Sequence, residues 1–201
     1  MKILKTHEKI RSGKTARFLV LLPHRDSRNL LENYRQKLFA FGFAGAYSFP
    51  PAAPLALLSR SLDRNELKQI AREIRKITLT RNGKITAGNS DTVHFPAGGP
   101  FENAAFFGPV LDLQPPESIP GIDNEKTLYV LPKAVLCAAV TDPANSSAFS
   151  NTACLNPPDL TPFSFRAAII TNLVIRPLEN GAAPFSFEWR LGPECWLPAY
   201  K

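Results

Sequence analysis

The chain has 201 residues, a formal net charge of +7 and 44% apolar residues. This length suits one domain, and 20% charged residues together with the apolar content exclude wholesale disorder. The positive charge favours anionic partners such as RNA or nucleotides. A soluble protein can also carry such a charge without any anionic partner. The basic residues are densest between Lys2 and Arg17. We therefore expect residues 1–16 to form a basic N-terminal arm.

The three cysteines, Cys137, Cys154 and Cys195, have the spacing of neither a metal site nor a redox pair. We therefore expect free thiols in a reducing compartment, and no metal or other cofactor. The apolar run from Phe18 to Leu22 is too short for the core of a signal peptide or for a membrane span. The sequence thus predicts a cytoplasmic protein with no membrane partner.

The chain begins with a predicted strand and helix. The continuous apolar run Arg17–Pro23 predicts a central strand that ends at its proline. A helix follows, capped by Asp26 or Ser27 and stopped at Gly42. Its spacing predicts one apolar face, made of Leu30, Leu31, Tyr34, Leu38 and Phe39.

Two short strands, Ala46–Phe49 and Pro54–Ser59, are predicted next, and a second helix follows them. Asp63 and Glu66 have capping-box spacing at its start. The helix has a predicted buried stripe and an opposite basic face that we expect to be solvated. The stripe is Leu67, Ile70, Ala71 and Ile74, and the basic face is Arg64, Lys68, Arg72 and Arg75.

The chain after Lys76 predicts mostly strands. A hairpin is expected around Asn82 and Gly83. Pro132 interrupts one later strand, and the proline-rich segment 141–162 is predicted to be a long loop. The other predicted strands are Phe106–Leu113, Thr127–Val140 and a closing hairpin of Phe163–Leu178 with Pro184–Gly192. The order predicts an α+β fold with two main helices and largely antiparallel sheet(s).

Residues that could carry chemistry are few. The sequence has no phosphate-binding glycine loop, dinucleotide fingerprint, zinc pattern or glycine-framed nucleophile. Of the three histidines, His24 is the most interesting, because it directly follows the first strand, while His94 is expected in a loop or at a strand edge. Period two places Phe185, Phe187 and Trp189 on one face, which suits core packing better than a stacking platform for bases.

The layout "RFLVLLPHRDSRNLLENYRQKLFAFGF…YSFPPAAPLALLSRSLDRNELKQIAREI" resembles the start of the 2H phosphoesterases, the superfamily of 2′-5′ RNA ligase-like proteins and cyclic phosphodiesterases. The ending "FSFRAAIITNLVIRPLENGAAPFSFEWRLG" is similar to that family's closing hairpin. The resemblance implies that residues 17–201 form a single bilobal domain. It also implies two His-x-Thr/Ser motifs that face each other across a cleft, with one histidine as base and the other as acid.

Both motifs are degenerate in this chain. On the resemblance, the first falls on Pro54-Leu55-Ala56 and the second on Lys133-Ala134-Val135. Neither keeps a histidine or a hydroxyl, so Pro54, Ala56 and Val135 can neither transfer a proton nor hold a phosphate oxygen. Lys133 can still attract phosphate as a point charge. The family's helix before the second motif is replaced by the short, proline-broken Gln114–Lys126.

Three hypotheses follow. The first, which we favour, is a catalytically inactive 2H-like protein that binds a nucleotide, an RNA end or a protein partner in the inherited cleft, with His24, Arg60 and Lys133 as candidate ligand-binding residues. The second is an active phosphodiesterase for cyclic phosphates or RNA ends. It would use His24 or His94 and needs a histidine near Lys133 or Arg60. The third is an unrelated α+β interaction protein.

Overall fold

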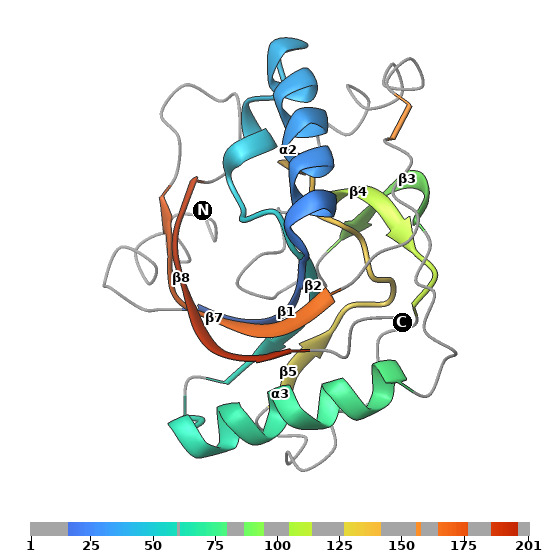
Figure 1. Cartoon of the computed structure of the whole chain (residues 1–201). Coiled ribbons are helices and arrows are strands. Elements are labelled where there is room, and N and C mark those ends of the chain that lie inside the picture. The colour runs from blue at the N-terminus through green and yellow to red at the C-terminus, as the bar shows by residue number, and fades with distance from the viewer. Residues whose placement is uncertain are drawn as a thin grey trace.

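The structure is a computed structural model that describes residues 16–59, 61–79, 87–94, 105–113, 127–141, 156–157, 165–176 and 186–196. The described strands pair antiparallel in two sheets, one of five strands and one of three (Figure 1). The larger sheet has the order β5 (Thr127–Val130), β2 (Ala53–Leu58), β1 (Ala16–Pro23), β7 (Phe165–Arg176) and β8 (Ser186–Trp196). The smaller sheet has the order β3 (Ala87–His94), β4 (Ala105–Leu111) and β6 (Ala139–Thr141). The predicted α+β class is confirmed.

β1 is the central strand that its apolar run predicted. It pairs with β2 on one side and β7 on the other, and Phe18 to Leu21 are fully buried. Leu19 and Leu21 pack into one apolar cluster, while Phe18 and Val20 pack into a second. Both faces of the strand are therefore covered, which explains why its sequence is continuously apolar rather than alternating.

Helix α2 (Arg25–Ala40) starts earlier than predicted. The N-cap is His24, which makes no capping bond with its side chain, and its carbonyl accepts from the Arg28 amide at 2.8 Å. The prediction of Asp26 or Ser27 as the cap is wrong, because helical hydrogen bonding begins directly after Pro23 ends β1. Gly42, with φ of 94°, follows the helix as predicted, in the left-handed region that glycine adopts without strain.

The buried face of α2 is narrower than predicted. Leu31, Tyr34 and Leu38 are buried, but Leu30 is 42% exposed and Phe39 is 53% exposed. Arg35 is buried on this helix in place of a further apolar residue, and Phe39, one turn later, packs against Tyr47 at the surface.

The segment Ala46–Phe49 is not a strand, contrary to prediction. The chain instead forms a 3-10 helix, η1 (Ala44–Tyr47), closed by local bonds such as Ser48 amide to Gly45 carbonyl at 3.1 Å. η1 packs on β6, and a Cβ built at Gly45 would lie 1.8 Å from the Val140 carbonyl oxygen. This close backbone approach, which pattern alone does not reveal, leaves no room for a side chain at this position.

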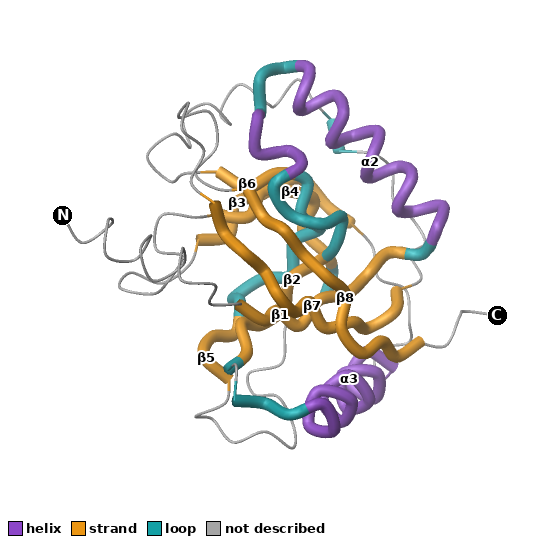
Figure 2. Tube along the Cα trace, turned by 90° about the vertical axis from the view of Figure 1, so that its left-hand side faces the viewer, coloured by secondary structure: helices purple, strands orange, loops and turns teal. Residues whose placement is uncertain are grey.

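Helix α3 (Arg64–Leu79) has the predicted capping box. The Asp63 amide donates to Glu66 Oε2, and the Glu66 amide donates to Asp63 Oδ1, each at 2.8 Å. The predicted stripe from Leu67 to Ile74 is buried, and the helix packs on β7 and β8. Figures 1 and 2 show the five-stranded sheet between α2 and α3.

α3 continues through residues 77–79, which were predicted to open a hairpin. The helical periodicity of the stripe outweighs the local strand propensity there. The turn at Asn82 and Gly83 lies outside the described residues. The closing hairpin strands are confirmed as the antiparallel pair β7 and β8. Three further predictions lie outside the described residues. They concern the arm up to residue 15, nearly all of the loop 141–162, and the side chains of Phe185, Phe187 and Trp189.

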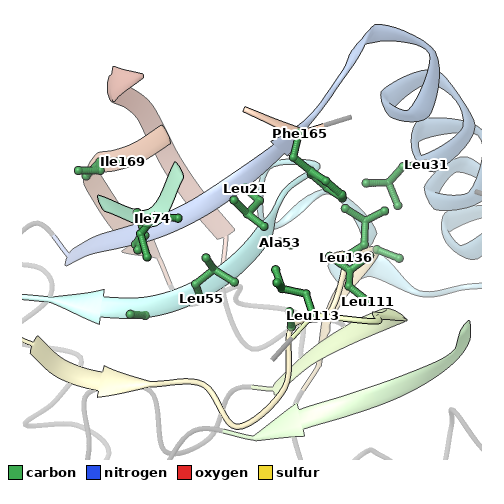
Figure 3. Packing of buried hydrophobic residues seen from close by; sticks show 14 of the residues in the cluster. Leu21, Leu31, Ala53, Leu55, Ile74, Leu111, Leu113, Leu136, Phe165 and Ile169 are labelled. Atoms are coloured by element: carbon green, nitrogen blue, oxygen red, sulfur yellow. The ribbon is translucent and has the colours of Figure 1, made fainter. Parts of the chain in front are cut away.

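Residues 131–138, which we call the seam, join the two sheets. The predicted strand Thr127–Val140, interrupted by Pro132, is wrong for residues 131–138: β5 ends at Val130, strand structure resumes only at β6, and the two strands lie in different sheets. Between them the chain runs between β2 and β4. On one side, the amides of Leu131 and Cys137 donate to the carbonyls of Leu55 and Ala52, each at 2.9 Å. On the other side, the amides of Leu136 and Ala138 donate to Pro109 and Phe107 at 2.9 and 2.8 Å. Figure 3 shows Leu55 of β2, Leu111 of β4 and Leu136 of the seam in one apolar cluster.

Candidate functional site

Three of the four predicted motif positions are buried. Pro54 and Ala56 lie on β2, which is buried along its whole length, and Ala56 pairs with Val130. Val135 lies in the seam, forms an isolated bridge with Val110 and is fully buried. Solvent therefore does not reach these side chains, and the ladder hydrogen bonds of β2 and the seam occupy the backbone around them.

The fourth motif position, Lys133, is exposed and paired. Its Nζ donates to Oδ2 of Asp91 on β3 at 2.8 Å, and about half of each side chain is exposed. This hydrogen bond is the main reason that the pKa of Asp91 lies below its usual value, although partial burial opposes it. The Thr92 amide also donates to the same carboxylate, to Oδ1 at 2.7 Å. A phosphate at Lys133 must therefore compete with a carboxylate that is already in place.

His94, the last residue of β3, lies in the electrostatic reach of the same carboxylate. It lowers the pKa of Asp91 to a smaller extent than Lys133 does. We call Asp91, His94 and Lys133 the acid-base cluster. His94 is exposed at the edge strand of the three-stranded sheet, as predicted. His24 is also exposed, but it lies at the junction of β1 and α2, and Arg60 lies outside the described residues.

Tyr34 connects α2 to β3 beside this cluster. Its hydroxyl and the Ser90 hydroxyl are 3.2 Å apart, and the Tyr34 side chain is buried. Burial raises the pKa of Tyr34, and the hydrogen bond to Ser90 opposes this effect only in part. Tyr34 is therefore protonated at neutral pH and serves as a hydrogen-bonding link between the elements.

Arg35 is a buried cation that the sequence reasoning did not single out. Its Nε donates to the Ala46 carbonyl at 2.6 Å and its Nη2 to the Phe49 carbonyl at 2.7 Å, while Glu32 lies 3.6 Å from Nη1. Burial lowers the pKa of Arg35, and the charge of Glu32 opposes this effect. A signal was present in the sequence, since position 35 lies four residues after Leu31 and three before Leu38, on the apolar face of the helix.

Phe39 of α2 and Tyr47 of η1 form an exposed aromatic pair. Their ring centroids are 5.6 Å apart in an edge-to-face arrangement, and the two side chains are 53% and 49% exposed. The Arg35 guanidinium carbon lies 5.0 Å from the Tyr47 ring centroid. Tyr47 was predicted to lie in a short strand, so its pairing with Phe39 could not be seen from the sequence.

Cys137, in the seam, is not a nucleophile at neutral pH. Burial raises the pKa of its thiol to about 12, although the charge of Arg35 pulls it slightly downward. Catalytic thiols are instead partly exposed and have lowered pKa values. Within the described part of the chain, no three His, Cys, Asp or Glu residues are grouped so that they could hold a metal ion.

Neither helix in the described ranges is long and apolar enough to cross a membrane. Comparison of the chain with protein-family models, with curated proteins and with solved structures finds no match.

Proposed function

We propose that this protein is a non-catalytic binding protein of bilobal, 2H phosphoesterase-like architecture, and that it binds a nucleotide or an RNA end. The observation that carries the proposal is the burial of Pro54, Ala56 and Val135, the positions at which the resemblance places catalytic side chains. Apolar groups there transfer no proton, and acid-base catalysis contributes roughly 10²–10⁴-fold per positioned group. The loss of these groups removes the family's route of catalysis and favours a binding function.

The charge of the molecule supports an anionic partner. The net charge is +7, and cations are exposed on both helices. Arg25, Arg28 and Lys37 lie on α2, and Arg64, Lys68 and Arg72 lie on α3. When such side chains neutralise the phosphate groups of a nucleic acid, the counterions around the phosphates are released. This release contributes binding affinity and needs no catalytic group.

The test has a binding arm and a turnover arm. In the binding arm, fluorescence anisotropy with a labelled 12-nucleotide RNA should show saturable binding. The logarithm of the association constant should fall linearly with the logarithm of the salt concentration. In the turnover arm, the protein should not hydrolyse 2′,3′-cyclic nucleotides above background. Absence of RNA and nucleotide binding at low salt would overturn the proposal, as would robust hydrolysis.

A second candidate function rests on the acid-base cluster. An active phosphodiesterase with relocated residues requires a histidine near Lys133; Lys133 pairs with Asp91 of β3, and His94 is the last residue of the same strand. In that function, His94 would exchange a proton with the reacting oxygen while Lys133 attracts the phosphate. Hydrolysis that disappears in a His94→Ala variant but persists in a His24→Ala variant would establish it.

A further inference from the structure

We propose that the aromatic pair of Phe39 and Tyr47 is a stacking platform for bases of single-stranded RNA. The inference rests on the proposed function and gives it a contact surface. Aromatic rings on a positively charged surface are the common device for binding single strands without reading their sequence, because every base has a π face. The two rings come from different elements, stand edge to face at 5.6 Å and remain about half exposed.

Two hydrogen bonds hold the backbone that carries Tyr47. Arg35 fixes the backbone on both sides of Tyr47, since it donates to the Ala46 carbonyl before it and the Phe49 carbonyl after it. The same guanidinium lies 5.0 Å from the centroid of the Tyr47 ring. A segment whose backbone is already held loses less conformational entropy on binding. A buried arginine thus supports an exposed ring, an arrangement that core packing alone does not require.

The surroundings favour a polyanion over an apolar protein partner. The C-terminal end of α2 carries the exposed polar residues Gln36 and Lys37 as well as the exposed rings of Phe39 and Phe41, so cationic and aromatic side chains occur together there. Arg25 and Arg28 are exposed further along the same helix. A ligand that presents flat rings on a negatively charged backbone fits both features, and single-stranded RNA has this chemistry.

Phe41 provides a matched control. It is an exposed phenylalanine at the C-cap of α2, 68% exposed, and thus more accessible than Phe39. It lies two residues beyond Phe39, which is about 200° around a helix axis. Phe41 therefore shares the residue type and the helix end with Phe39 but is not part of the ring pair.

The experiment measures the affinity of the full chain for a labelled 12-nucleotide uridine RNA and for an abasic strand of equal length. Phe39→Ala and Tyr47→Ala should each weaken binding of the uridine strand roughly 5- to 100-fold, whereas Phe41→Ala should leave it within about twofold. Tyr47→Phe keeps the ring and should bind nearly as wild type. All variants should bind the abasic strand as wild type does.

Leucine variants keep the result interpretable if an alanine variant folds poorly. Phe39→Leu and Tyr47→Leu retain apolar bulk without a ring, so they should melt near the wild-type temperature yet bind the uridine strand weakly. Unchanged affinity in the Phe39 and Tyr47 variants, with a wild type that binds, overturns the platform alone. Equal losses on the abasic strand overturn stacking. A wild type that binds no RNA overturns the proposed function as well.

A second copy of this chain, the alternative partner for this surface, would give a different result. Light scattering measures the oligomeric state of the wild-type protein and of the two alanine variants. A wild-type dimer that becomes a monomer in both variants, with RNA affinity unchanged, assigns the surface to contact between copies of the chain and overturns the proposal.

Discussion

Arg35 of α2 donates from Nε to the backbone carbonyl of Ala46, 2.6 Å away, inside the apolar interior. This bond and its companion to Phe49 hold η1 against the helix, at a segment whose sequence suggests a strand. A buried cation is costly unless its hydrogen bonds are satisfied, so the local structure depends on both carbonyls.

Replacement of Arg35 should destabilise the fold strongly. Arg35→Met leaves two buried carbonyls without their donor, at about 1–3 kcal/mol for each unsatisfied group. We expect the free energy of unfolding in urea to fall by about 2–6 kcal/mol. Lys37→Met replaces an exposed basic residue on the same helix and should change the free energy of unfolding by less than about 0.5 kcal/mol. Equal stability of the two variants would show that the carbonyls find other donors.

Gly108 should tolerate no side chain. A Cβ at this position would lie 1.8 Å from the Leu136 carbonyl oxygen, so Gly108→Ala must push the seam away from β4. The expected loss is at least about 2 kcal/mol, as for overpacked cores. Gly88→Ala is the control, because its nearest neighbouring atom would lie at 3.8 Å. Thermal unfolding of both variants measures the difference, and similar melting temperatures would contradict the close approach.

The Asp63 capping box should contribute about 1 kcal/mol to stability. Asp63→Ala removes the acceptor for the amides of Asn65 and Glu66, both now bonded to Oδ1. Asp63→Asn keeps a capping oxygen and should retain most of the stability. Chemical denaturation that ranks the alanine and asparagine variants equally would show that the side-chain cap is unimportant.

The Asp91–Lys133 pair should give a small, pH-dependent contribution. The pKa of Asp91 is lowered in the folded protein, so the contribution is fully present above the ordinary pKa of 3.8 and is lost as pH falls through the lowered value. Because both side chains are half exposed, we expect less than about 1 kcal/mol. In Lys133→Ala, an NMR titration of the Asp91 carboxyl should show its pKa moved upward. An unchanged pKa would mean that the pair does not persist in solution.

Much of the fold could be predicted because single segments carry their own signals. The continuous apolar run at Phe18 to Leu22, the Asp63 and Glu66 box and the positive-φ Gly42 each depend on local sequence. η1 and the exposure of Phe39 could not be predicted, because both involve contacts between two elements: Arg35 bonds to the carbonyls of Ala46 and Phe49, and Phe39 packs on Tyr47. The division into two sheets was also hidden, since it is set by the hydrogen bonds of residues 131–138 to β2 and β4.

The candidate site was harder to predict than the fold. The sequence placed Lys133 at a motif position, but its partner Asp91 is 42 residues away and was one of several scattered carboxylates. Pairing across such a separation depends on the three-dimensional arrangement of β3 and the seam, which no local pattern encodes. The aromatic pair was missed for the same reason, since its two rings lie on different elements.

The seam affects how cooperatively the protein unfolds. Its amides alternate between the two sheets, so the sheets cannot separate from each other without breaking hydrogen bonds on one side of the seam. The two sheets should therefore behave as one cooperative unfolding unit rather than as two independent subdomains. In native-state hydrogen exchange, the amide protons of Leu131, Leu136, Cys137 and Ala138 should exchange together, and only when the whole protein unfolds.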